Sequence, residues 1–365
     1  MKEGCKVKGN ISNAEYIKKS EQQKDLEWLV ENSRYLDIYK DSVVFITGAT
    51  GFVGSNLVKL FLHCNRKKNT HIHIVAAVRN YNKAEEIYGS LLTESDLEIY
   101  EGDVVVPITY NKSVDYIFHT ASVTASKMMV EHPVCTIETA YQGTKNVLEL
   151  AKRCGVKGMV YVSSMEVYGV PDASLEEIRE TELGYIDIGN VRSSYSEGKR
   201  ICECMCTAYA SEFGVPVRAA RLAQTFGAGI FDSDNRVYAQ FARSAIEGKD
   251  IVLHSDGTSE GNYCYIQDVL EALLLLGIKG ESGQAYNIVN ESSHMRIIDM
   301  ARMVAEEIAE GKIKVIFDIP ESSMTYGYAP TVKMKLCGEK IRALGWEPRV
   351  DLLESYKRMI EDIKS

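Results

Sequence analysis

The sequence predicts an α/β fold: a Rossmann-type doubly wound parallel sheet followed by a smaller mixed α/β C-terminal domain. Three observations predict it. Short apolar segments alternate with helical stretches between residues 41 and 222, the first apolar segment runs into a glycine-rich turn, and the pattern becomes mixed after residue 222. A chain of 365 residues is long enough for one large domain or two closely joined ones.

The domain boundaries follow from changes in this pattern. Residues 1–40 are charged and weakly periodic, and we interpret them as an N-terminal extension whose residues 26–30 form a helix docked on the body. Residues 41–222 form the Rossmann domain, to which 262–290 are expected to return, and 223–365 form most of the C-terminal domain. Prolines and glycines around 320–330 predict a flexible connection.

The expected elements are short strands and longer amphipathic helices. Strands are predicted at 43–46, 73–78, 115–118, 159–162, 285–288 and 313–317. Helices are predicted around 57–62, 144–152, 237–247, 266–276 and 297–310, with a last helix from Leu352.

Composition limits the class of partner and the compartment. The net charge is −9 and the basic residues are dispersed, which argues against nucleic acid and anionic membranes as partners. The first six residues begin no apolar signal segment, and the apolar run at 272–277 is far shorter than the ~20 residues of a membrane span. Nine scattered cysteines suit a reducing cytosol, so we expect a cytoplasmic protein.

The densest cysteines predict buried side chains. Cys202 and Cys206 share a helical face, whereas Cys204 points elsewhere. Small buried residues are the preferred interpretation and a zinc site is the alternative; we assign no metal ligands.

A glycine triplet between the first strand and the first helix predicts a phosphate-binding turn. Gly48, Gly51 and Gly54 permit the tight turn, the backbone's approach to a pyrophosphate and close packing of helix on strand. Backbone N–H groups and the helix dipole then hold the phosphate charge, and we assign Thr50 and residues 52–53 (Phe52, Val53) to the same site. A structural tight turn is the alternative.

The end of the second strand bears on the choice of dinucleotide. An acidic residue usually binds the ribose 2′-hydroxyl of NAD there, but this chain has Arg79. A guanidinium can bind the 2′-phosphate of NADP, so NADP is favoured over NAD, although Arg79 could instead stack on adenine or face solvent. Asp103, at the end of the third strand, could accept a hydrogen bond from the adenine amino group.

A tyrosine and a lysine four residues apart predict a proton-transfer site. Tyr195 and Lys199 lie on one helical face, and the lysine's charge is expected to lower the pKa of the phenol. Ser164 follows a strand and could hydrogen-bond the substrate hydroxyl that loses its proton to Tyr195. Glu166 is a candidate second acid or base; helix capping or a surface position is the alternative.

These residues together resemble the extended short-chain dehydrogenase/reductases, the NAD-dependent epimerase/dehydratase family. The resemblance extends from about residue 43 to residue 348. The motifs that carry it are Thr-Gly-Ala-Thr-Gly-Phe-Val-Gly at 47–54, His-Thr-Ala-Ser at 119–122, Ser-Ser-Met-Glu-Val-Tyr-Gly at 163–169, Tyr-Ser-Glu-Gly-Lys-Arg at 195–200 and Arg-Leu-Ala-Gln-Thr-Phe-Gly at 221–227.

The resemblance implies further contacts and a mechanism. It implies cofactor contacts from Val104, Thr120, Ala121 and Val162, and substrate contacts from Ser122, in a Rossmann domain whose smaller partner domain binds a nucleotide sugar. It implies that Tyr195 takes a proton from a sugar hydroxyl, usually at C4, while hydride passes to the cofactor and usually returns. The motifs around Ser164 and Tyr195 look closest to UDP-glucuronate decarboxylases.

Several positions depart from the family pattern. The aspartate that 4,6-dehydratases use as an acid is Met165 here, which disfavours sugar 4,6-dehydration. Gln224 replaces an asparagine near the sugar phosphate, Gly261 replaces a phosphate-binding arginine, and residues 228–229 lack a common Pro-Arg. Arg236 remains as a cationic candidate for the diphosphate. Loss of the arginine weakens the assignment as a decarboxylase.

The leading hypothesis is an NAD(P)-dependent, epimerase-like enzyme acting on a nucleotide sugar through a transient keto sugar. The alternatives are an NADPH-dependent reductase or dehydrogenase of a sugar or polyol derivative, a UDP-glucuronate decarboxylase-like enzyme, and a binding protein that has lost catalysis. Helices around 132–154 and 195–213 predict a homodimer by analogy with the family.

Overall fold

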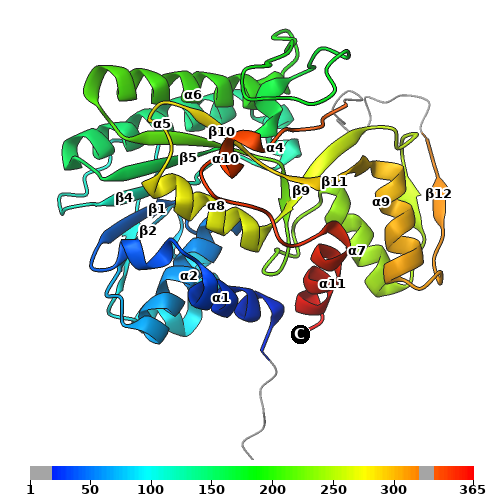
Figure 1. The fold of residues 1–365 in the computed structure, drawn as a ribbon, viewed down its shortest axis with the longest axis horizontal. Helices are drawn as coiled ribbons and strands as arrows, with labels where there is room; N and C mark the ends of the chain where they lie inside the picture. The colour runs from blue at the N-terminus through cyan, green and yellow to red at the C-terminus, as the bar shows by residue number, and fades with distance from the viewer. Residues whose placement is uncertain (1–18, 320–332) are drawn as a thin grey trace, which may run out of the picture.

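The computed structural model describes residues 19–319 and 333–365. The first residues of the chain and the connection expected at 320–330 lie outside the described residues. The sequence predicted an α/β doubly wound fold, and the structure confirms it (Figure 1).

A seven-stranded parallel sheet forms the centre of the Rossmann part. Its order is β10-β6-β5-β4-β1-β2-β3. Each hydrogen-bonded pair of neighbours in it is parallel. The strands are β1 Val43–Thr47, β2 His73–Val78, β3 Leu97–Glu101, β4 Tyr116–His119, β5 Gly158–Ser164, β6 Val217–Leu222 and β10 Ala285–Ile288. The order reverses between β1 and β4, and ligands of such sheets bind beyond the carboxyl ends of the strands at this position.

Helices cover both faces of this sheet (Figure 1). On one face lie α4 Ser126–Glu131, α5 Pro133–Cys154 and α6 Ser193–Phe213, and on the other lie α1 Glu21–Asn32, α2 Phe52–Lys68 and α8 Ile266–Ile278. Leu273–Leu276 of α8 are fully buried because this helix, which is apolar on nearly all sides, packs between the sheet and other helices. The run at 272–277 is therefore a core helix.

The C-terminal part has smaller sheets and its own apolar core. Its strands are β7 Gln224–Phe226, β8 Ile251–Leu253, β9 Glu260–Tyr265, β11 Asn290–Arg296 and β12 Val315–Phe317, paired as β11-β9-β7 and β12-β8. The remaining helices are α3 Tyr81–Tyr88, which follows β2, and α7 Val237–Glu247, α9 Ile297–Met303, α10 Glu339–Arg342 and α11 Leu352–Ile363. At the centre of this second core, Phe226 stacks on Tyr238 and packs at a tilt against Tyr356.

Two segments refine the sequence prediction. The single helix expected at 297–310 ends as an α-helix at Met303 and continues as a π-helical turn over Val304–Ile308. The docked N-terminal helix is confirmed as α1, which buries Leu26, Leu29 and Val30. Among residues 19–319 and 333–365, no helix combines the length and apolar character that crossing a membrane requires.

Candidate active site

The turn between β1 and α2 has the geometry of a phosphate-binding turn. Gly48 has a φ of +64°, and a Cβ there would lie 2.6 Å from the Ala121 backbone nitrogen. A Cβ on Gly54 would lie 2.4 Å from the Gly48 carbonyl oxygen. No side chain caps the start of α2, whose N-cap residue is Gly51, so the N–H groups of the first turn are available to an anion. The turn therefore fits a dinucleotide pyrophosphate, and Thr50, Phe52 and Val53 lie partly buried around it.

The ends of β2 and β3 bring Arg79 and Asp103 together. One Nη of Arg79 lies 3.9 Å from a carboxylate oxygen of Asp103, and both side chains are exposed. Asp103 also accepts a hydrogen bond from the Val105 backbone N–H. Val104 is buried, and its carbonyl oxygen accepts from Asn146 of α5. An exposed cation and a carboxylate thus stand at the sheet edge where the adenosine half of the cofactor was expected.

Residues 119–122 link β4 to the glycine turn. The Thr120 hydroxyl donates to the Thr47 carbonyl oxygen over 2.7 Å, and the Ala121 N–H donates to the Thr47 hydroxyl over 3.3 Å. Ser122 follows, partly buried. His119 is buried between the hydroxyls of Thr47 and Thr144, and this burial lowers its pKa to about 3. His119 is therefore a neutral residue that holds β1, β4 and α5 together.

Tyr195 and Lys199 meet beside the end of β5, on the first turns of α6. The Lys199 amine is buried, donates to the Val162 carbonyl oxygen over 2.7 Å and lies 5.7 Å from the centroid of the Tyr195 ring. Burial lowers the pKa of Lys199 to about 8. The predicted pairing of the two residues on one helical face is therefore present in the fold.

The pKa expected for the phenol needs correction. Burial, followed by the charge of Glu166, raises the pKa of Tyr195 to about 12. A hydrogen bond with Ser164 and the charges of Arg192 and Arg236 act in the opposite direction. The chain's own residues thus hold Tyr195 protonated, in contrast to the lowering expected from Lys199.

Glu166 is held in place by residues that the sequence analysis missed. Its backbone N–H donates to the Ser164 hydroxyl over 3.2 Å, and its two carboxylate oxygens accept from Arg192 at 2.9 Å and from Ser196 at 3.3 Å. Arg192 lies three residues before Tyr195, so helical spacing could have placed it on the same face. No motif quoted above includes Arg192.

The residues predicted for the substrate side of the site lie on β7, β9 and the start of α7. Gln224 begins β7, opposite Tyr263 of β9. A Cβ on Gly261 in β9 would meet no atom of residues 19–319 and 333–365 within 4 Å, so none of these residues fills the position of the missing arginine. Arg236 pairs with Asp234 and lies over the Tyr238 ring. Its positive charge acts to lower the pKa of Tyr195. Arg236 is thus a cation near the phenol, although a carboxylate partly neutralises it.

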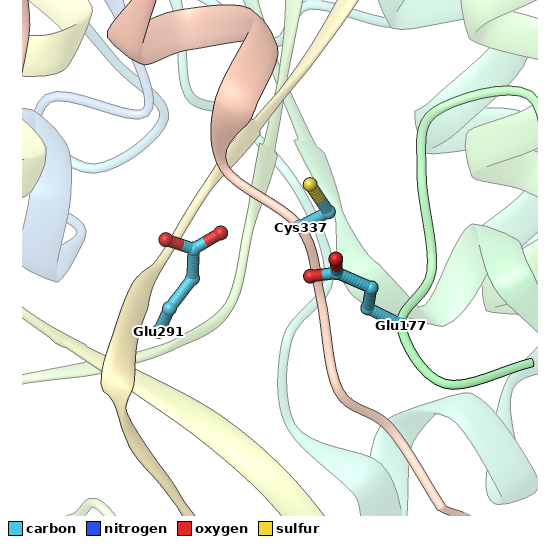
Figure 2. A group of neighbouring side chains, drawn as sticks. All are labelled: Glu177, Glu291 and Cys337. Atoms are coloured by element: carbon cyan, nitrogen blue, oxygen red, sulfur yellow. The ribbon is translucent and has the colours of Figure 1, made fainter.

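The cysteines and one cluster of acidic residues are the remaining candidates for metal ligands. Cys202 and Cys206 are buried while Cys204 is exposed, and the Cys202 thiol donates to the Ala140 carbonyl oxygen. Within the described ranges, ligand-type atoms of Glu177, Glu291 and Cys337 all lie within 4.8 Å of one another (Figure 2). Glu291 is already paired with Arg342, and burial raises the pKa of the Cys337 thiol, so ion pairing and packing account for the group.

Known proteins resemble this chain in both sequence and fold. The model of the NAD-dependent epimerase/dehydratase family matches residues 44–290. UDP-glucuronic acid decarboxylase 3 of Arabidopsis thaliana is 30% identical over 322 residues, which cover 88% of this chain and 89% of the relative. UDP-glucuronic acid decarboxylase 1 of Xenopus tropicalis is 30% identical over 87% of this chain and 71% of its own length.

The fold has solved counterparts at lower identity. A structure titled as an epimerase of Methanothermobacter thermautotrophicus has a TM-score of 0.76 at 21% identity, covering 92% of this chain and 95% of that one. At this identity the likeness concerns the fold.

Proposed function

Because the chain belongs to the NAD-dependent epimerase/dehydratase family, we propose that it is an epimerase-like enzyme, which oxidises a nucleotide sugar to a transient keto sugar and then returns the hydride, so that the overall reaction is redox-neutral. The observation that carries the proposal is the meeting of Ser164, Tyr195 and Lys199 beside the end of β5. An ordered hydroxyl, a phenol and a buried amine are the groups that proton removal from a sugar hydroxyl needs.

The proposed roles follow from these contacts. Tyr195, once ionised to the phenolate, takes the hydroxyl proton, and Ser164 hydrogen-bonds both the phenol oxygen and the reacting oxygen. Lys199, fixed by the Val162 carbonyl, supplies positive charge as the phenol loses its proton. The chemistry that the dinucleotide supplies when bound is the acceptance and return of a hydride. The turn at 48–54 and residues Thr120 and Ala121 would hold it.

We propose that the chain prefers NADP to NAD as its cofactor. The support is Arg79, which is 66% exposed at its side chain and only weakly paired to Asp103 at 3.9 Å, so it can turn toward a 2′-phosphate. Asp103 itself could accept from an adenine amino group or from a ribose hydroxyl. Copurifying dinucleotide, identified by native mass spectrometry, tests this choice directly.

Decarboxylation of a nucleotide-linked hexuronate is the second candidate reaction. It is favoured by Glu166 beside Tyr195 and by relatives that carry the name UDP-glucuronic acid decarboxylase. In this reaction the bond between the carboxylate carbon and the keto sugar breaks and carbon dioxide leaves. A proton from an acidic group of the protein then takes the place of the carboxylate on the sugar carbon. The absence of an arginine at Gly261 argues against it, since the substrate's anions would lose one charge-assisted contact.

A product assay separates these reactions. The protein is incubated with UDP-glucuronic acid and with UDP-glucose, and products are analysed by mass and by carbohydrate NMR. An unchanged mass with inverted stereochemistry supports epimerisation, and loss of carbon dioxide supports decarboxylation. Stoichiometric consumption of NADPH would contradict a redox-neutral cycle and favour the reductase. The Tyr195→Phe variant is the control, and it should lose about 10²- to 10⁴-fold in rate.

We further propose a homodimer formed through α5 and α6. Apolar side chains stand exposed along the outer faces of these helices: Val134, Ile137 and Tyr141 on α5 and Ile201 on α6. A second copy would remove this surface from water. Sedimentation should show a dimer at micromolar concentration, and Ile137→Glu combined with Ile201→Glu should yield monomers.

A further inference from the structure

Glu166 is held on both sides by the beginning of α6. One carboxylate oxygen accepts from an Arg192 Nη at 2.9 Å, and the other accepts from the Ser196 hydroxyl at 3.3 Å. The Arg192 side chain is 18% exposed and that of Glu166 is 32% exposed, so this pair is less hydrated than an ordinary surface pair.

The residues that hold Glu166 belong to the same helical face as the proton-transfer residues. Residues 192, 195, 196 and 199 are spaced at i, i+3, i+4 and i+7, which places Arg192, Tyr195, Ser196 and Lys199 on one side of α6. The guanidinium carbon of Arg192 lies 5.8 Å from the centroid of the Tyr195 ring. The arginine therefore contacts Glu166 directly and also lies within electrostatic reach of the phenol.

Tyr195 is surrounded by charges of both signs from several elements. Glu166 approaches from the turn after β5, Arg236 from the start of α7 and Lys199 from α6. The hydroxyls of Ser164 and Tyr161 come from β5. Among these groups Glu166 is the anion, and its charge opposes formation of a tyrosinate.

We infer that Arg192 is a positioning residue for the proposed reaction: it fixes the Glu166 carboxylate and neutralises its charge beside Tyr195. Without this pairing, a carboxylate and a phenolate would have to coexist in a partly dehydrated place, which Coulomb repulsion disfavours. The inference rests on the proposed function because it assumes that Tyr195 must ionise. Arg192 acts on the Tyr195 phenol largely through the Glu166 side chain.

A purely structural role for Arg192 predicts a different behaviour. Arg200, also on α6, donates to the carbonyl oxygens of Val167 and Gly184 and so holds the connecting segment in place. Loss of such an arginine would lower stability but leave the ionisation of Tyr195 unchanged. The midpoint of that ionisation is therefore the readout that separates positioning from structure.

The test is a difference titration that needs no substrate. Tyrosinate absorbance of the protein loaded with oxidised dinucleotide, whose cationic ring lowers the pKa of the neighbouring phenol, is followed against pH. The same titration of the Tyr195→Phe variant is subtracted, which isolates this phenol among 21 tyrosines. Arg192→Met should raise the Tyr195 midpoint by about one pH unit or more, since an opposite charge at this range shifts a pKa by ~1–3 units. Arg192→Lys should restore most of the shift because it keeps the charge.

Two further variants trace the effect to Glu166. Glu166→Gln should lower the midpoint, since it removes the anion and leaves Arg192 unpaired. The double variant with Arg192→Met should titrate near the wild-type value, because both charges are gone. Arg179 lies on the segment between β5 and α6 and is paired with Glu339 of α10. Arg179→Met is the matched control and should leave the Tyr195 midpoint unchanged.

The outcomes are distinct. A midpoint in Arg192→Met equal to that of the wild type would overturn the inference, and Arg192→Gln takes its place if Arg192→Met does not fold. Failure of the proposed function would show elsewhere, as no nicotinamide reduction on adding nucleotide sugars, while the titration would still report on Arg192.

Discussion

Gly54→Ala is the substitution for which the structure gives the sharpest expectation. The new methyl carbon would lie 2.4 Å from the Gly48 carbonyl oxygen and 2.8 Å from the Thr120 hydroxyl. The carbonyl oxygen would have to retreat by at least 0.6 Å to reach the 3.0 Å below which such contacts essentially never occur. This oxygen accepts the Gly51 N–H at 2.8 Å, so its movement disturbs the turn that cradles the pyrophosphate.

Two opposing terms set the size of the effect. Overpacking of this kind costs ~1–3 kcal/mol, whereas alanine in a helix is favoured over glycine by ~1 kcal/mol. Fold stability should therefore fall by only about 0–2 kcal/mol. Dinucleotide affinity should fall by about tenfold to a hundredfold, because α2 can relax only by moving the N–H groups that bind the phosphate.

The assay is calorimetric titration of dinucleotide together with chemical unfolding. Gly51→Ala, whose Cβ would lie 3.1 Å from the same oxygen, should give an intermediate effect. Gly261→Ala, whose Cβ meets no atom of the described part of the chain within 4 Å, is the matched control and should bind as the wild type does. Equal affinities for Gly54→Ala and Gly261→Ala would refute the close-approach reasoning.

Three more predictions follow from single contacts. Burial raises the pKa of Asp25 to about 6 against an ordinary 3.8, so the stability that this group contributes is present below about pH 4 and is lost as pH rises through 6. In urea unfolding at a series of pH values, Asp25→Asn should remove up to ~3 kcal/mol of this pH dependence. Parallel plots of unfolding free energy against pH for the wild type and the variant would contradict the prediction. Glu203→Gln leaves Arg221 buried without its anion and should cost ~3–5 kcal/mol in unfolding free energy, with the exposed Glu339→Gln as control. Arg79→Ala should weaken NADP binding by about tenfold or more while sparing NAD in calorimetric titrations, and an equal loss for both would exclude a 2′-phosphate contact.

Sequence patterns predict those features of this protein that are local in the chain. Strand, glycine turn and helix at 43–62 are adjacent in the chain, so spacing and backbone conformation alone predict a phosphate-binding turn there, and Gly48 and Gly54 have that geometry. Tyr195 and Lys199 are one helical turn apart, so their pairing is also local. The alternation of strands and helices was enough to predict the α/β class.

Tertiary structure alone decided the contacts that set the chemistry around Tyr195. Arg192 and Glu166 are separated by 26 positions, and no periodic pattern links residues so far apart. The phenol shows why this matters. Neighbouring Lys199 suggested a lowered pKa, but burial and Glu166, which depend on how β5, α6 and α7 pack, raise it to about 12. Desolvation and charge depend on the whole surroundings of a group, which only the packed fold specifies.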